Sequence, residues 1–358
     1  MAKAVVLFSG SLASIVAARL VLKQPGVREI KLLHLRSPFF KEYEPVLSPN
    51  TGITHRTAKD IAQEALPGAT FRSQSVKKDL RALAPSFIPP QQCSNSQRLK
   101  HGCMNCRHWL LRKALRYMRR ANVNADFIVT GEVVGERGLG VAEIERLTEL
   151  AGATGLVLRP LSAQLLPETI PEKMGWVDRR SLKGFRASDR EKIRALAREL
   201  GVEIADFPAE RRCKLMIPYF TPRLERLLHE ETLTLNALEL LEFPLYYKCP
   251  PDVTIVLGRD DEEKRRLQSF FLPEDLRLYL PDHRGPMALV RANWKTKSPQ
   301  EIRQIIETAA RVAAAHAPKP PETVQALWRF ENARETSKIS VKPFQSPQEL
   351  EAHHLKLV

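Results

Sequence analysis

The first 22 residues combine a buried strand, a turn of small residues and a helix, with no spacer between them. Residues 5–8 are β-branched and apolar, which is typical of a strand buried on both faces. Ser9, Gly10 and Ser11 favour a turn, and the apolar residues that follow repeat with a helical period. The junction exposes backbone N–H groups and the positive end of a helix dipole. It therefore predicts either a phosphate site or an ordinary strand-to-helix turn.

The same alternation continues through the first half of the chain. Further strands are predicted at residues 30–35, 69–76, 126–130 and 155–159, and helices at 55–66, 109–121, 141–151 and 190–200. This order predicts an α/β domain with a parallel sheet, whose ligands bind at the carboxyl ends of the strands. Ser9-Gly10 and Gly131-Glu132 both follow predicted strands.

A different pattern follows residues 245–252 (LYYKCPPD), which we interpret as a domain boundary. Helix-like segments at 220–242 precede it. The strands expected after it are 253–257, 276–280, 288–291, 324–330 and 339–342, with helices at 261–271 and 299–316. The prediction is an N-terminal domain over 1–245 and a smaller α+β domain over 252–345.

The net charge of +15 is concentrated in the first 251 residues. From Asp252 onward, 17 Lys/Arg face 15 Asp/Glu, which leaves about +13 for the N-terminal part. Such an excess points to a polyanionic partner, with nucleic acid first, although a basic surface kept for solubility has the same composition. No apolar run reaches the length of a membrane span, and Ser9 interrupts the first one, so we expect a cytoplasmic protein without a membrane partner.

Five cysteines, an odd number, argue against a disulfide framework. Cys103 and Cys106 form a CxxC pair, and Cys213 is the best candidate for a third ligand. Three thiolates would suit an iron–sulfur cluster and four would suit zinc, while free thiols are the third alternative. We interpret Cys93 and Cys249 as structural.

The segment after the CxxC pair, residues 107–123, carries six Lys/Arg residues and no acid. Its periodicity predicts an apolar helix face opposite a basic one. The residues expected to contact an RNA backbone are Arg112, Lys113, Arg116, Arg119 and Arg120. The alternative interpretation is that these residues form an ordinary solvent-exposed helix face.

Several of these blocks together resemble the PP-loop ATPases of the tRNA thiouridine synthetase type, within the adenine nucleotide alpha-hydrolase superfamily. The residues that carry the resemblance are Ser9-Gly10-Ser11-Leu12-Ala13-Ser14, Leu33-His34-Leu35, the CxxC pair, residues 128–137 (IVTGEVVGER), residues 158–163 (LRPLSA) and residues 170–178 (IPEKMGWVD). Cys213 stands where that family has its third cysteine. The resemblance covers roughly residues 1–240.

The resemblance implies an ATP-dependent tRNA sulfurtransferase. ATP with Mg²⁺ would bind through Ser9, Gly10, Ser11, Ser14, His34, Gly131 and Glu132. A base carbonyl in tRNA would be adenylated, and sulfur from a donor protein would then replace its oxygen. Cys103, Cys106 and Cys213 would be the catalytic residues, either as persulfide carriers or as ligands of a [4Fe-4S] cluster, with zinc as the alternative.

Two loop positions depart from the family pattern. Ser11 stands where the family has glycine, and Ala13 stands where it has aspartate. The alternative function is therefore a catalytically degenerate relative that binds tRNA or nucleotide without turnover, and an ATP-using enzyme with another substrate is a third.

The C-terminal part resembles the RNA-binding domain that ends the NFACT ribosome quality-control proteins. Residues 255–264 (IVLGRDDEEK), residues 285–290 (GPMALV) and the helix after Pro299 carry this resemblance. It implies RNA binding by a domain whose own net charge is nearly neutral.

Overall fold

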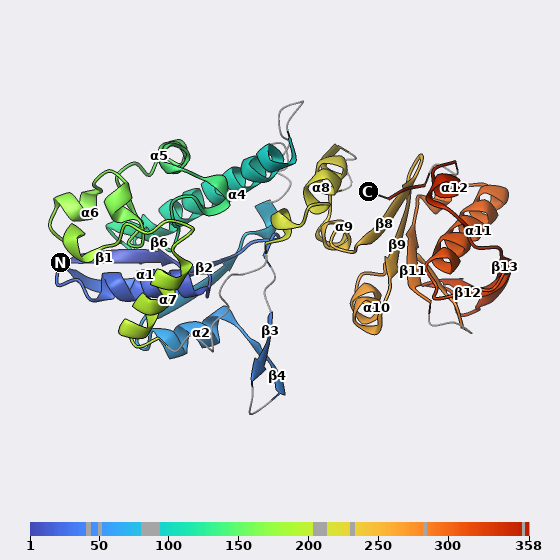
Figure 1. Ribbon diagram of the computed structural model, residues 1–358, viewed down its shortest axis with the longest axis horizontal. Helices are drawn as coiled ribbons and strands as arrows, with labels where there is room; N and C mark the ends of the chain where they lie inside the picture. The colour runs from blue at the N-terminus through green and yellow to red at the C-terminus, as the bar shows by residue number, and fades with distance from the viewer. Residues whose placement is uncertain are drawn as a thin grey trace. The chain divides into compact units, whose positions relative to one another are not determined.

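The computed structural model describes residues 1–40, 44–48, 52–79, 94–202, 213–229, 233–281, 285–352 and 355–357. The chain divides into two compact units, Met1–Thr221 and Pro222–Val358 (Figure 1). The division falls before the boundary that we expected at residues 245–252. Cys93 lies outside the described residues.

The N-terminal unit is built on a five-stranded sheet with the order β5-β2-β1-β6-β7. Every neighbouring pair in it is parallel. The strands are β1 (Ala2–Leu7), β2 (Val27–Arg36), β5 (Thr70–Ser75), β6 (Phe127–Thr130) and β7 (Val157–Leu158). The predicted α/β class with a parallel sheet is confirmed.

Helices cover both faces of this sheet (Figure 1). They are α1 (Leu12–Leu22), α2 (Ala58–Ala65), α4 (Asn95–Met118), α5 (Val141–Leu150), α6 (Ile170–Lys173) and α7 (Arg190–Glu199). Alternate residues of β1 point to opposite faces, so Val6 joins a core with α1, α2 and α7, while Val5 joins one with α4 and α5. A strand buried on both sides explains the uninterrupted apolar run at its centre.

Helix α4 begins well before the predicted start of that helix at Trp109. The Ser94 side chain accepts from the Gln97 N–H, and the Gln97 side chain accepts from the Ser94 N–H. This capping box starts the helix at Asn95. The prediction that the CxxC pair precedes the helix is therefore wrong, because Cys103 and Cys106 lie inside it, one turn apart.

An antiparallel hairpin joins β2 to α2 and was not predicted. It consists of β3 (Glu44–Ser48) and β4 (Gly52–Arg56).

The C-terminal unit contains a seven-stranded sheet with the order β13-β12-β10-β11-β9-β8-β14. All of its neighbouring pairs are antiparallel. The strands are β8 (Leu245–Cys249), β9 (Val253–Gly258), β10 (Leu276–Tyr279), β11 (Met287–Arg291), β12 (Val324–Phe330), β13 (Ser337–Val341) and β14 (Lys356–Leu357). The segment interpreted as a boundary thus supplies β8, which pairs with β9 from Leu245 to Cys249.

In the described part of the chain, the helices that accompany this sheet are α8 (Phe220–His229), α9 (Leu235–Leu240), α10 (Asp261–Gln268), α11 (Pro299–Ala315) and α12 (Pro347–Ala352). Helix α11 packs an alanine-rich face on the sheet, where Ala309, Ala310 and Ala313 are fully buried. This arrangement agrees with the predicted smaller α+β domain. Among the described helices, none has both the length and the apolar character needed to cross a bilayer.

Arg223 of α8 ties the helical start of the C-terminal unit to its first strand. Its Nη1 donates to the carbonyls of Leu241 and Phe243, at 2.9 and 2.6 Å, and its Nη2 donates to that of Pro244 at 3.0 Å. The Arg223 residue is only 2% exposed, so these carbonyls have little access to water.

We predict that Arg223→Met destabilises the C-terminal unit by about 3 kcal/mol, because it leaves buried carbonyls without donors. Thermal unfolding followed by calorimetry measures the change. Arg226→Met, at an exposed position of the same helix, is the control and is expected to shift the unfolding free energy by less than about 0.5 kcal/mol. Equal effects of the two substitutions would contradict the assignment.

Candidate functional site

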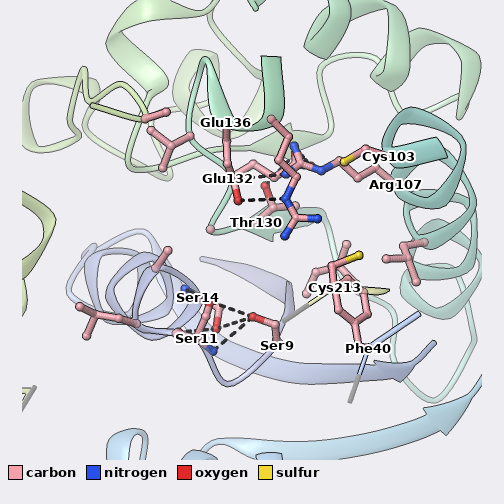
Figure 2. Close-up of a pocket in the computed structure, with 18 of the residues that line it drawn as sticks. Ser9, Ser11, Ser14, Phe40, Cys103, Arg107, Thr130, Glu132, Glu136 and Cys213 are labelled. Atoms are coloured by element: carbon pink, nitrogen blue, oxygen red, sulfur yellow. Dashed lines mark hydrogen bonds and ion pairs between the residues drawn. The ribbon is translucent and has the colours of Figure 1, made fainter. Parts of the chain in front are cut away.

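The turn between β1 and α1 is held in shape by its own serines. Gly10 has a φ of 82°, a backbone conformation that glycine adopts without strain. Ser11 caps α1, and its side chain accepts from the Ser14 N–H. Ser9 Oγ lies 2.9 Å from Ser11 Oγ and donates to Ser14 Oγ at 3.3 Å (Figure 2). The three hydroxyls therefore gather at the amino end of the helix, where the dipole favours an anion.

Gly131, at the end of β6, lies directly against this turn. A Cβ atom at Gly131 would lie 2.7 Å from the carbonyl carbon of Ala13 and from the Ser14 nitrogen. Only glycine allows so close an approach of the two backbones. Because β1 has β2 on one side and β6 on the other, the two junctions meet where the strand order reverses, the usual ligand position in such sheets.

A cavity of about 410 Å³ opens at this point. Its walls include Ser9, Ser11, Ala13 and Ser14 from the turn, Thr130, Gly131 and Glu132 after β6, Cys103, Cys106 and Arg107 from α4, Arg190 and Arg194 from α7, and Phe40, Glu136, Arg137 and Cys213 (Figure 2). The structure thus brings together the serine turn, the end of β6 and all three candidate cysteines.

Glu132 is the centre of a buried ion-pair network. Arg159 Nε donates to its Oε2 at 2.8 Å, and Arg107 Nη1 lies 3.2 Å from its Oε1. Burial alone would raise the pKa of Glu132, but the two guanidinium groups outweigh it and hold that pKa below its usual value. Glu132 is therefore an ionised anchor that joins β6 to α4 and to the end of β7.

Arg107 also binds Glu136, with 3.0 Å between Nη2 and Oε2. The next residue, Arg137, has a φ of 56°, which is uncommon for a side chain of its size. The Arg137 guanidinium interacts electrostatically with the Cys213 thiol, which favours its charged form and raises the pKa of Arg137. Four charged residues of the site were not predicted from the sequence: Arg107, Glu136, Arg137 and Arg159. The charged side chains of residues 135–137 (GER), close after a predicted strand, were the one sequence feature that could have indicated them.

The three thiols of the cavity are all buried. Burial raises the pKa of Cys106 well above its ordinary value, and the neighbouring thiols of Cys213 and Cys103 raise it further. Burial also raises the pKa of Cys213, while Arg137 opposes the rise. These mutual effects indicate that the sulfur atoms share one environment. Cys249 lies apart in β8 of the C-terminal unit.

Three thiols have suitable chemistry for an iron–sulfur cluster or zinc. Within the described part of the chain, however, no three His, Cys, Asp or Glu side chains are arranged to hold a metal ion. As described, these thiols do not form a metal-ion site, and the chemistry proposed below uses them as sulfur nucleophiles only.

Other predicted site residues lie outside the cavity walls. The His34 ring is buried, and its Nδ1 is hydrogen-bonded to the Phe8 carbonyl at 2.9 Å. The side chains of Arg112, Arg116, Arg119 and Arg120 are exposed, at the C-terminal end of α4 and just beyond it. Lys113 is ion-paired with Asp79 at 2.5 Å, so its charge is already partly compensated.

Residues 246–353 match the family model described as the NFACT protein RNA binding domain. This match supports the predicted resemblance of the C-terminal part, and it supports RNA as a partner class for that part. The family model does not extend to the N-terminal unit.

No curated protein matches the chain. A structural match is the C-terminal part of the fibronectin/fibrinogen-binding protein from Streptococcus suis, with 11% identity over 77% of this chain and 96% of that one. Its TM-score is 0.26, so the likeness carries no argument.

We predict that Glu132→Gln lowers the free energy of unfolding by about 3 kcal/mol, because two buried guanidinium groups lose their common partner. The folded-state pKa of Glu132 is lowered. Its contribution to the free energy of unfolding is therefore complete above the unfolded-state pKa of about 4.3 and is lost as the pH falls through the folded-state pKa. Urea unfolding between neutral and acidic pH measures both effects.

Glu145→Gln, at an exposed position of α5, is the matched control. It should change neither the free energy of unfolding at neutral pH nor its decrease on acidification. A Glu132→Gln variant that loses stability on acidification as steeply as the unmodified protein would contradict the anchoring role.

Proposed function

We propose that the protein is an ATP-dependent tRNA sulfurtransferase of the PP-loop type. One observation carries the proposal: the serine turn, the end of β6 and three thiols line the same cavity at the sheet's switch point. Phosphate binding and sulfur chemistry would then take place in one compartment.

The nucleotide phosphates would bind at the turn. The amino end of α1 offers backbone N–H groups, and Arg190 and Arg194 of α7 bring positive charge to the same cavity. A cavity of about 410 Å³ is within the range of small-molecule sites. ATP with Mg²⁺ is the nucleotide that the resemblance implies.

The first step is adenylation. The carbonyl oxygen of a base in tRNA forms a bond to the α-phosphorus of ATP, and the bond to pyrophosphate breaks. The activated carbon then carries AMP as a leaving group, which the carbonyl itself lacked.

The second step transfers sulfur. The terminal sulfur of a persulfide bonds to the activated carbon and AMP leaves. A second thiolate attacks the carrier sulfur, which releases the thiolated base and leaves a disulfide that an external dithiol reduces. We assign the carrier role to Cys213, because Arg137 stabilises its thiolate. Cys103 and Cys106 are then the resolving thiols.

Features of both units that suit RNA binding support the proposed tRNA substrate. The exposed arginines of the α4 region, Arg112, Arg116, Arg119 and Arg120, can bind phosphates. The match to an RNA-binding domain supplies a second contact region. A separate sulfur donor protein would load the persulfide.

The second candidate function is binding of tRNA or nucleotide without turnover. The observation that favours it is the lack of an unpaired carboxylate among the described residues that line the cavity. Ala13 contributes none at the wall where the family has aspartate. The two glutamates among the described lining residues, Glu132 and Glu136, are both ion-paired with arginine. Phosphate could still bind at the turn, whereas Mg²⁺ would have no unpaired carboxylate among these residues.

We expect the purified protein to release AMP from α-labelled ATP only when bulk tRNA is present. Cys213→Ala should retain this release within about threefold and form no thiolated nucleoside, because adenylation does not need the thiol. Chromatography of labelled AMP and mass spectrometry of digested tRNA provide the two measurements.

Ala13→Asp and its uncharged control Ala13→Asn separate the two candidates. If the unmodified protein releases no AMP and Ala13→Asp alone does, the result would establish binding without turnover. AMP release at the same rate with and without tRNA would contradict the proposal that tRNA is the substrate. No AMP release from the unmodified protein or from either variant would contradict the proposal that the protein activates ATP.

A further inference from the structure

One face of the C-terminal sheet is covered along only part of its width. On β10, β12 and β13, alternate residues point into the core beneath α11, including Leu278, Ala326 and Val341. The residues between them point to the opposite face. These are Arg277 and Tyr279 of β10, Gln325, Leu327 and Arg329 of β12, and Lys338 and Ser340 of β13, and we call them the open face.

Tyr279 is the most informative residue of the open face. It is 37% exposed, and it is the one exposed aromatic side chain among the described residues of the whole chain. A tyrosine ring has a flat apolar face and a polar hydroxyl, so an exposed one can stack on a ligand's ring while its hydroxyl stays in water. Beyond β10 the same side of the sheet is closed, since Val256 of β9 and Leu289 of β11 are fully buried.

The sheet register places positive charge beside the ring. Tyr279 pairs with Leu327, which pairs in turn with Lys338, so the three side chains form one row across the strands. With two interstrand spacings, Lys338 lies about 10 Å from Tyr279 across the sheet. Lys338 is exposed and has no ion pair with a described residue.

A second row carries two arginines. Arg277 and Arg329 are directly opposite each other on β10 and β12. Both contact Glu331, Arg277 with two bonds of 2.9 and 3.1 Å and Arg329 at 3.6 Å. Because one carboxylate neutralises only one of the two guanidinium groups, this row keeps a net positive charge. The guanidinium carbon of Arg277 also lies 4.5 Å from the centre of the Phe271 ring. The row is thus rigid and cationic.

We propose that the open face binds an unpaired stretch of RNA, with a base stacked on Tyr279 and neighbouring phosphates near Lys338 and Arg329. Only an unpaired base presents a free ring face to an aromatic side chain, whereas a duplex hides its bases in the stack. The positive charge complements a phosphate backbone. The inference rests on the match to an RNA-binding domain and on this geometry, and it holds whether or not the protein activates ATP.

The test measures binding of the full-length protein, without ATP, to a labelled single-stranded RNA of about 12 nucleotides and to an RNA hairpin whose loop is replaced by a polyethylene glycol linker, so that the hairpin offers no unpaired base. Tyr279→Ala should weaken single-strand binding about tenfold and leave hairpin binding nearly unchanged, while Tyr279→Phe should keep it within about twofold. Lys338→Ala should lower the slope of log affinity against log salt by about 0.7.

Lys295→Ala is the matched control, since this exposed lysine follows Trp294, which packs on the opposite, core side of the sheet. It should change neither affinity nor salt slope. Ultraviolet cross-linking of the same single strand, mapped by mass spectrometry, should locate a cross-link at Tyr279. Thermal unfolding of each variant shows that the fold is intact.

Unchanged single-strand affinity in Tyr279→Ala would overturn the proposal, and so would an equal loss for strand and hairpin. Cross-links confined to the arginines of the α4 region would also overturn it. These outcomes are independent of AMP release, so failure here is distinguishable from failure of the sulfurtransferase proposal.

Discussion

The ion pairs of Glu132 with Arg107 and Arg159 hold the cavity of the N-terminal unit together. They join the end of β6, helix α4 and the residue that follows β7 around one carboxylate. Because this carboxylate is buried, removing either partner would leave an uncompensated charge, so the three elements are held at one spacing. The thiols of α4 owe their position opposite the serine turn to this connection, since Arg107 follows Cys106 directly.

The same network limits what the cavity can do. Its carboxylates are already paired with arginines. The hydroxyls of the turn bond to one another and to the turn's own backbone, and they can exchange those bonds for a ligand's oxygen atoms. The wall formed by the serine turn is therefore best suited to binding an anion. The three thiols line the opposite wall, where burial raises the pKa of Cys106 and of Cys213 and Arg137 opposes the rise for Cys213.

Much of the fold could be predicted from local pattern. The apolar run before Ser9, the turn and the amphipathic helices predict a parallel sheet, because strands buried on both faces need helices on both. Segment 245–252 was interpreted as a boundary because Pro250 and Pro251 favour one, whereas Leu245 to Cys249 also form a strand, whose character depends on pairing with β9. The start of α4 was missed although its capping box stands in the sequence, because the charged and polar first turns have little apolar periodicity.

The sequence by itself determined the class of the N-terminal unit, the turn after β1 and the three cysteines as candidates, because each depends on neighbours in the chain. Tertiary structure alone decided that Arg107 and Arg159 share Glu132, since their separation along the chain gives no sign of contact. It also decided that Tyr279, Leu327 and Lys338 form one row, because strand register is set by the packing of the opposite face against α11. Local pattern identifies elements, and long-range packing selects which of their side chains meet.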